Sequence, residues 1–251
     1  MSGSLPARWT DLRRFTPARV ALGRAGNGLP TVAHLAFQAA HAAARDAVHA
    51  ELDVPALLAD LAAAELAGVA VRSAVPDRRT YLLRPDLGRT LRAEDRAALP
   101  SVPGAVVFVI ADGLSAIAAQ RHAVSLLSQV LPRLWPGGAV APVVIATQAR
   151  VALGDEIGEA MQADAVAVLI GERPGLSAAD SLGVYLTWQP RRGRTDAERN
   201  CISNIRPEGL PIDRAAAKLL WLIAAMRRLG LTGVGLKDEQ PDTLAALPLP
   251  D

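Results

Sequence analysis

Cysteine is almost absent from the sequence, since Cys201 is the only one in 251 residues. One thiol excludes an intrachain disulfide, and it excludes a zinc or iron–sulfur site built from thiolates of this chain. Long apolar runs are missing as well: none reaches the roughly 18 residues of a membrane span, and the first residues contain no apolar signal core. We therefore expect a soluble, cytoplasmic protein with no membrane partner and no metal ligands.

Lysine is scarce too, because Lys218 and Lys237 are the only two and arginine carries nearly all of the positive charge. The formal net charge is +2, which is too small to indicate a nucleic-acid surface. We therefore exclude nucleic acid as a partner. With 51% hydrophobic residues, the chain is long enough to bury a core in one domain or in two unequal ones.

Catalytic motifs are the third absence. The chain has neither G-x-x-x-x-G-K nor G-x-S-x-G, and the glycines of GRAGNG have the reverse of the dinucleotide spacing. His34, His41 and His49 share a helix face, but steps of seven and eight residues do not suit two ligands of one metal. A stand-alone α/β nucleotide-binding enzyme and a cofactor-free scaffold remain alternatives, although no clustered nucleophile, base and acid supports an independent enzyme.

The first hundred residues predict a smaller, mainly helical region (1–100). Thr31 is expected to cap a helix that runs to Ala50, with a polar stripe of residues three or four apart. The other elements expected in this region are helices at 56–67 and 93–99 and short strands at 69–75 and 80–83.

Residues 101–251 predict a Rossmann-like α/β domain, because buried apolar runs alternate with helical patterns after Pro100 and Pro103. A mainly parallel sheet follows from this alternation. Gly230 is expected to end the last helix. The expected strands are 105–110, 142–147, 164–172, 182–188 and 200–205, and the expected helices are a long one after Ser115, a short one at 155–162 and a last one at 213–229.

Strand ends are the candidate ligand positions, because open parallel sheets bind ligands at the carboxyl edges of their strands. Asp112, Glu172 and the loop after Trp188 are all expected at this edge. Asp112 also suits a purely structural turn, so both interpretations stay open for it. Cys201 lies in a strand-like run without a nearby histidine, which favours a buried residue over a nucleophile.

Several long segments also carry a family resemblance. The segments are DLRRFTPARVALGRAGNGLPT (11–31), FQAAHAAARDAVH (37–49), VVFVIADGLSA (106–116), RVALGDEIGE (150–159), LGVYLTWQPRRGRTDAERNCISNIRPEG (182–209) and AAAKLLWLIAAMRRLGLTGVGLKDE (215–239). Together and in this order they resemble the small (light) subunit of ethanolamine ammonia-lyase, an adenosylcobalamin-dependent radical enzyme. The resemblance covers nearly the whole chain.

The resemblance implies a hetero-oligomer with a large subunit, a TIM barrel that binds ethanolamine and carries the catalytic side chains. This chain then has no catalytic residue and contacts adenosylcobalamin through Val151, Glu172 and Cys201. No histidine lies in a D-x-H-x-x-G loop, so the cofactor is expected to keep its own dimethylbenzimidazole on cobalt (base-on). The complex is expected in the cytoplasm, either free or within a bacterial microcompartment.

Overall fold

The computed structural model describes residues 12–16, 18–134 and 141–239. Its centre is a six-stranded sheet with the order β1-β3-β2-β4-β5-β6. The first four of these strands are mutually parallel, whereas β5 is antiparallel to both of its neighbours. The strands are β1 (Gly68–Arg72), β2 (Val106–Ala111), β3 (Val143–Thr147), β4 (Ala165–Gly171), β5 (Leu182–Trp188) and β6 (Arg199–Ile205).

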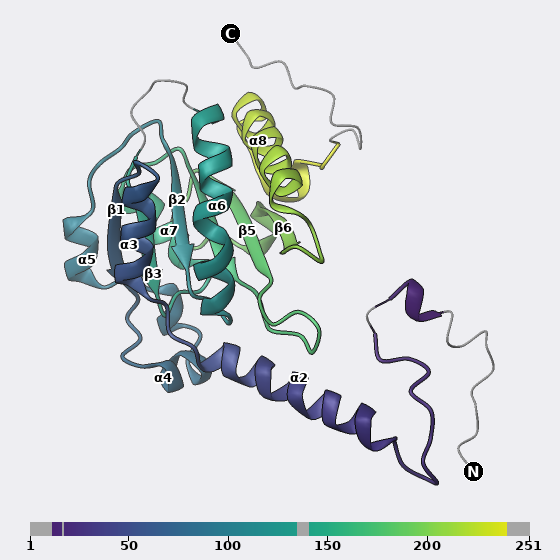
Figure 1. Ribbon diagram of the computed structural model, residues 1–251. Coiled ribbons are helices and arrows are strands. Elements are labelled where there is room, and N and C mark those ends of the chain that lie inside the picture. Colours follow the sequence, from purple (N-terminus) through teal and green to yellow (C-terminus); the bar gives the residue numbers. More distant parts are fainter. Residues whose placement is uncertain (1–11, 17, 135–140, 240–251) are drawn as a thin grey trace.

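Helices cover both faces of this sheet, which explains why β2 and β4 are apolar and buried along their whole lengths (Figure 1). The faces carry separate cores: α3, α6 and α8 pack on one, and α5 and α7 pack on the other. The helices are α2 (Thr31–His49), α3 (Val54–Ala63), α4 (Arg78–Leu83), α5 (Ala93–Ala98), α6 (Ala116–Leu134), α7 (Leu153–Ala160) and α8 (Ile212–Leu229), with short 3-10 turns η1 (Leu12–Arg14), η2 (Leu87–Arg89), η3 (Asp196–Glu198) and η4 (Gly233–Gly235).

Local chemistry sets several of the helix ends. The Asp53 side chain accepts the backbone N–H of Ala56 at 3.0 Å and so begins α3. Gly230 ends α8 with φ of +65°, as predicted. Gly113, with φ of +56°, lets the loop after β2 touch the end of β4, because a Cβ there would lie 2.2 Å from the Gly171 carbonyl oxygen.

The mainly parallel α/β class is confirmed, with corrections in the N-terminal region. Residues 80–83 form part of α4 and not a strand, because Asp77 accepts the Thr80 N–H and begins a helix. Thr31 does not cap α2, since the N-cap residue is Pro30 and no side chain bonds there. The second helix ends at Ala63, before Glu65 with φ of +58°.

The antiparallel direction of β5 corrects the expected ligand edge. Because Trp188 pairs with Ala165, the loop after Trp188 lies at the amino edge of the parallel strands. Asp112 and Glu172 do lie at the carboxyl edge, directly after β2 and β4. The division at residue 100 stays a prediction, and β1 from the first part pairs with β3 from the second.

Candidate functional site

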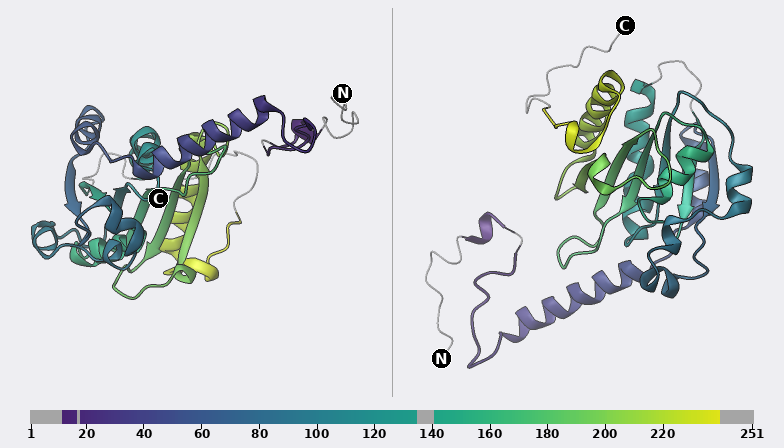
Figure 2. Two further views of the ribbon diagram at one scale, coloured as in Figure 1. Left: turned by 90° about the horizontal axis from the view of Figure 1, so that it is seen from below. Right: turned by 180° about the vertical axis from the view of Figure 1, so that it is seen from behind.

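The three predicted contact residues lie on the face of the sheet that carries α7. Val151 follows the turn after β3, is half-buried and packs against the core under α7. Glu172 follows β4 directly, and Cys201 belongs to β6. Since the side chain of Ile202 enters the opposite core, Cys201 faces the α7 side. The α7 helix does not cover all of β6 (Figure 2). The Cys201 side chain is exposed.

The Glu172 carboxylate joins the ends of three strands. Its Oε2 accepts the Ser181 hydroxyl at 2.6 Å and the Asn204 N–H at 3.2 Å, and its Oε1 accepts the Ser203 hydroxyl at 2.6 Å. A carboxylate offers about four acceptor positions. Among the residues that the structure describes, no second hydrogen bond to Oε1 is formed, so Oε1 can accept a ligand N–H.

Cys201 departs from the expectation of a buried cysteine. It pairs across the strands with Tyr185, and its side chain keeps contact with solvent. The surrounding chain still partly desolvates the thiol, which raises the pKa of Cys201, and burial also raises the pKa of Tyr185. Both groups are consequently neutral near pH 7, so this part of the face offers polarisable surface and no thiolate nucleophile.

Asp112 is a structural anchor at the same edge. The side chain is 2% exposed and accepts the backbone N–H groups of Gln148 at 2.7 Å, Ala149 at 2.9 Å and Gly113 at 2.9 Å. Burial raises the pKa of Asp112, while these N–H groups and the Arg78 guanidinium, 3.4 Å away, oppose the rise. Sequence reasoning missed Arg78, Gln148 and Ala149 as partners, because they lie more than thirty positions from Asp112 in the chain.

Ser115 lies directly before α6, and its Oγ accepts the Ala118 N–H at 3.4 Å, as a capping residue does. The same hydroxyl donates to the Ala179 carbonyl at 2.7 Å. Ser115 therefore also ties the start of α6 to the loop before β5.

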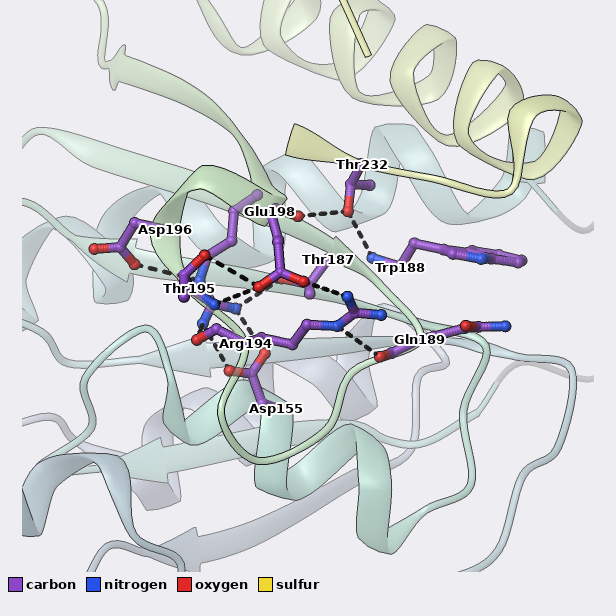
Figure 3. Close-up of polar contacts among 10 residues, drawn as sticks. Asp155, Thr187, Trp188, Gln189, Arg194, Thr195, Asp196, Glu198 and Thr232 are labelled. Atoms are coloured by element: carbon purple, nitrogen blue, oxygen red, sulfur yellow. Dashed lines mark hydrogen bonds and ion pairs between the residues drawn. The ribbon is translucent and has the colours of Figure 1, made fainter. Parts of the chain in front are cut away.

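The arginine-rich loop after Trp188 forms hydrogen bonds and ion pairs within the chain (Figure 3). Arg194 pairs with Glu198, and Arg199 forms a buried bidentate pair with Asp155 at 2.6 and 2.7 Å. The Thr195 backbone N–H and Arg194 lower the pKa of Glu198 to about 2. These charges serve the fold at the amino edge and do not join the three predicted contacts.

Metal and membrane features are lacking in the residues that the structure describes. No group of three His, Cys, Asp or Glu side chains in those residues is placed to hold a metal ion. His34, His41 and His49 all lie exposed along α2, and His34 bonds to Gln38. Within the same residues, no helix is both long and apolar enough to span a bilayer.

These features define a class: an α/β protein with a Rossmann-like sheet, a face beside α7 that is open to solvent at Cys201, and no self-sufficient catalytic set in its described residues. Comparison with known proteins gives the family. Residues 6–237 match the family described as ethanolamine ammonia-lyase light chain (EutC). The chain therefore belongs to this family of small subunits of a carbon–nitrogen lyase.

Curated relatives named ethanolamine ammonia-lyase small subunit are similar over nearly their full lengths. The protein of Bradyrhizobium diazoefficiens is 57% identical over 245 residues, which are 95% of this chain and 94% of the relative. That of Azotobacter vinelandii is 54% identical over 249 residues, 95% and 92% of the two chains. The protein of Xanthomonas campestris pv. campestris is 53% identical over 238 residues, which are 92% of this chain and 88% of the relative.

Proposed function

We propose that this chain forms the wall over adenosylcobalamin at an interface with the large subunit of ethanolamine ammonia-lyase. The complex converts ethanolamine to acetaldehyde and ammonia, with its catalytic side chains on the large subunit. The observation that carries the proposal is the open face beside α7, where Val151, Glu172 and Cys201 lie within a chain that matches the family over residues 6–237.

The residues of this face fit the cofactor chemically. A corrin is a broad, largely apolar ring with amide side chains on its rim, so it needs apolar surface and a few hydrogen-bond acceptors. Val151 and the neutral Cys201 thiol offer the apolar surface, and Oε1 of Glu172 offers a hydrogen-bond acceptor. The neutral Cys201 thiol also suits a contact that must exclude water.

The residues of this chain bind and orient, and they move no proton. When bound, adenosylcobalamin supplies the radical chemistry through homolysis of its cobalt–carbon bond. The Glu172 carboxylate would accept an N–H from an amide on the corrin rim. Ser181 and Ser203 already hold this carboxylate in place. Val151 and Cys201 pack against the ring and keep solvent from the interface.

A large-subunit partner is consistent with the exposed helix α2. This helix has 19 residues, yet only Ala47 is buried among them. Three of its large apolar side chains are exposed, namely Val32 at 81%, Leu35 at 56% and Phe37 at 40%. Apolar exposure of this kind on a projecting element marks an interaction surface.

Reconstitution tests the proposal. We expect ethanolamine turnover with adenosylcobalamin only when both subunits are present, whereas substantial turnover by this chain alone would favour the stand-alone enzyme.

The base-on state can be tested in the same complex. With nitrogen-15 in the protein histidines only, the EPR splitting of bound cob(II)alamin should match that of the unlabelled complex, and an altered splitting would identify a protein histidine as the lower ligand.

A further inference from the structure

The turn between β3 and α7 has a conformation that its surroundings must impose. Gln148 has φ of +54°, a left-handed conformation that is unfavourable for a residue other than glycine. Val151, the predicted contact, follows only three positions later. A displaced turn would therefore displace Val151.

Three buried side chains bond all four main-chain polar groups of Gln148 and Ala149. Asp112 accepts both N–H groups, at 2.7 and 2.9 Å. The Ser73 hydroxyl donates to the Gln148 carbonyl at 2.7 Å, and the Tyr81 hydroxyl donates to the Ala149 carbonyl at 3.0 Å. Ser73 and Tyr81 are both 0% exposed.

The turn is also clamped from its other end. Arg150 donates from Nη2 to the Tyr81 carbonyl at 2.9 Å, and its guanidinium lies 4.0 Å from the centroid of the Tyr81 ring. The Arg78 guanidinium lies 4.5 Å from the same centroid. The Arg150 N–H donates to the Gly88 carbonyl at 2.8 Å. Four separate segments of the chain thus converge on three consecutive residues.

We propose that Asp112, Ser73 and Tyr81 are positioning residues, which fix this turn so that Val151 meets the cofactor in a preset geometry. The proposal rests on the proposed function. A rigid contact binds more tightly because little conformational freedom is lost when the complex forms.

Ser73→Ala in the complex with the large subunit tests this role, with Thr232→Val as the matched control. Both hydroxyls donate to a backbone carbonyl at 2.7 Å and accept a backbone N–H, but Thr232 bonds Glu198 and Trp188 at the opposite edge of the sheet. The readouts are the Kd for cyanocobalamin by equilibrium dialysis, KM and kcat with adenosylcobalamin, and the melting temperature.

We expect Ser73→Ala to weaken cyanocobalamin binding about fivefold, the usual net effect of one hydrogen bond, and to raise KM for the cofactor rather than lower kcat. Thr232→Val should change Kd by less than about twofold at a comparable loss of melting temperature. Unchanged Kd in Ser73→Ala, or an equal change in the control, would overturn the positioning role.

The proposed function can be judged separately in this experiment. If the wild-type complex binds cyanocobalamin and Ser73→Ala leaves the Kd unchanged, only the positioning role is overturned. If the wild-type complex does not bind cyanocobalamin, the positioning role and the proposed function are both overturned. Should Ser73→Ala fail to fold, Tyr81→Phe takes its place, because it removes only the hydroxyl that bonds Ala149 and keeps the ring that both guanidinium groups contact. The same result is expected for it.

Discussion

Glu172 combines two roles that a single carboxylate can fulfil because its oxygens have more acceptor positions than the fold uses. The serine hydroxyls at 2.6 Å hold it in place, so a ligand would meet a preorganised acceptor. The same bonds mean that removing Glu172 also takes an acceptor from Ser181 and Ser203. The effect of substituting Glu172 must therefore be compared with that of a variant that removes only a serine hydroxyl bonded to it.

Glu172→Ala is expected to weaken retention of adenosylcobalamin by about tenfold or more, because a charge-assisted hydrogen bond is lost, while kcat at saturating cofactor changes less. Titration of the cofactor against turnover measures this split. Ser203→Ala is the control, since it removes one donor to the carboxylate and leaves the carboxylate itself. Equal losses of affinity in the two variants would show that Glu172 acts only through the fold.

The α7 helix and β6 are joined by the pair of Asp155 and Arg199, whose side chains are both about 2% exposed. Arg199 also donates to the Thr187 hydroxyl at 2.9 Å, which extends the network to β5. This link fixes α7 against the antiparallel end of the sheet. It thereby sets the border of the open face on which Cys201 lies.

Asp155→Ala is expected to lower the free energy of unfolding by about 3–5 kcal/mol, because it removes the buried bidentate partner of Arg199. The anion that remains is the exposed Asp196, whose carboxylate lies 3.4 Å from Arg199 Nε. Urea denaturation of the chain measures the change. Asp86→Ala is the matched control, since Asp86 also forms a bidentate pair with arginine, at 2.9 and 2.7 Å, but at the surface. The control should leave stability nearly unchanged, and an equal loss in both variants would contradict the argument from burial.

Strand positions were predictable because β2, β3 and β4 are continuous apolar runs bounded by turn residues. The direction of β5 was missed, although a signal exists: residues 172–181 are too few for a helical crossover, which a parallel strand would require. The exposure of Cys201 follows from the same alternation that places Ile202 in the core. Tyr81 and Ser73 were not predictable as partners of the turn, since they lie 68 and 75 positions from it.

At the scale of the whole molecule, α2 projects from the body beside the carboxyl edge of the sheet (Figure 1). The segment before it reaches the loop between β4 and β5, because Arg19 donates to the Leu176 carbonyl at 3.2 Å. The helix and the proposed cofactor face thus border the same edge. Most helical stability in proteins comes from tertiary packing of an apolar face, so the exposed apolar side chains of α2 gain most from a partner.

Leu35→Glu combined with Phe37→Glu is therefore expected to weaken assembly with the large subunit by about tenfold or more, because each carboxylate would have to be desolvated in the interface. Sedimentation of mixtures over a range of concentrations measures the assembly, and the melting temperature of this chain alone should hardly change, since both side chains are already exposed. Ala36→Glu combined with Gln38→Glu is the control, because it adds two carboxylates at exposed positions of the same helix while keeping both large apolar side chains. Undiminished assembly of the first variant would contradict this docking role, and loss of self-association of this chain instead would identify a second copy as the partner of α2.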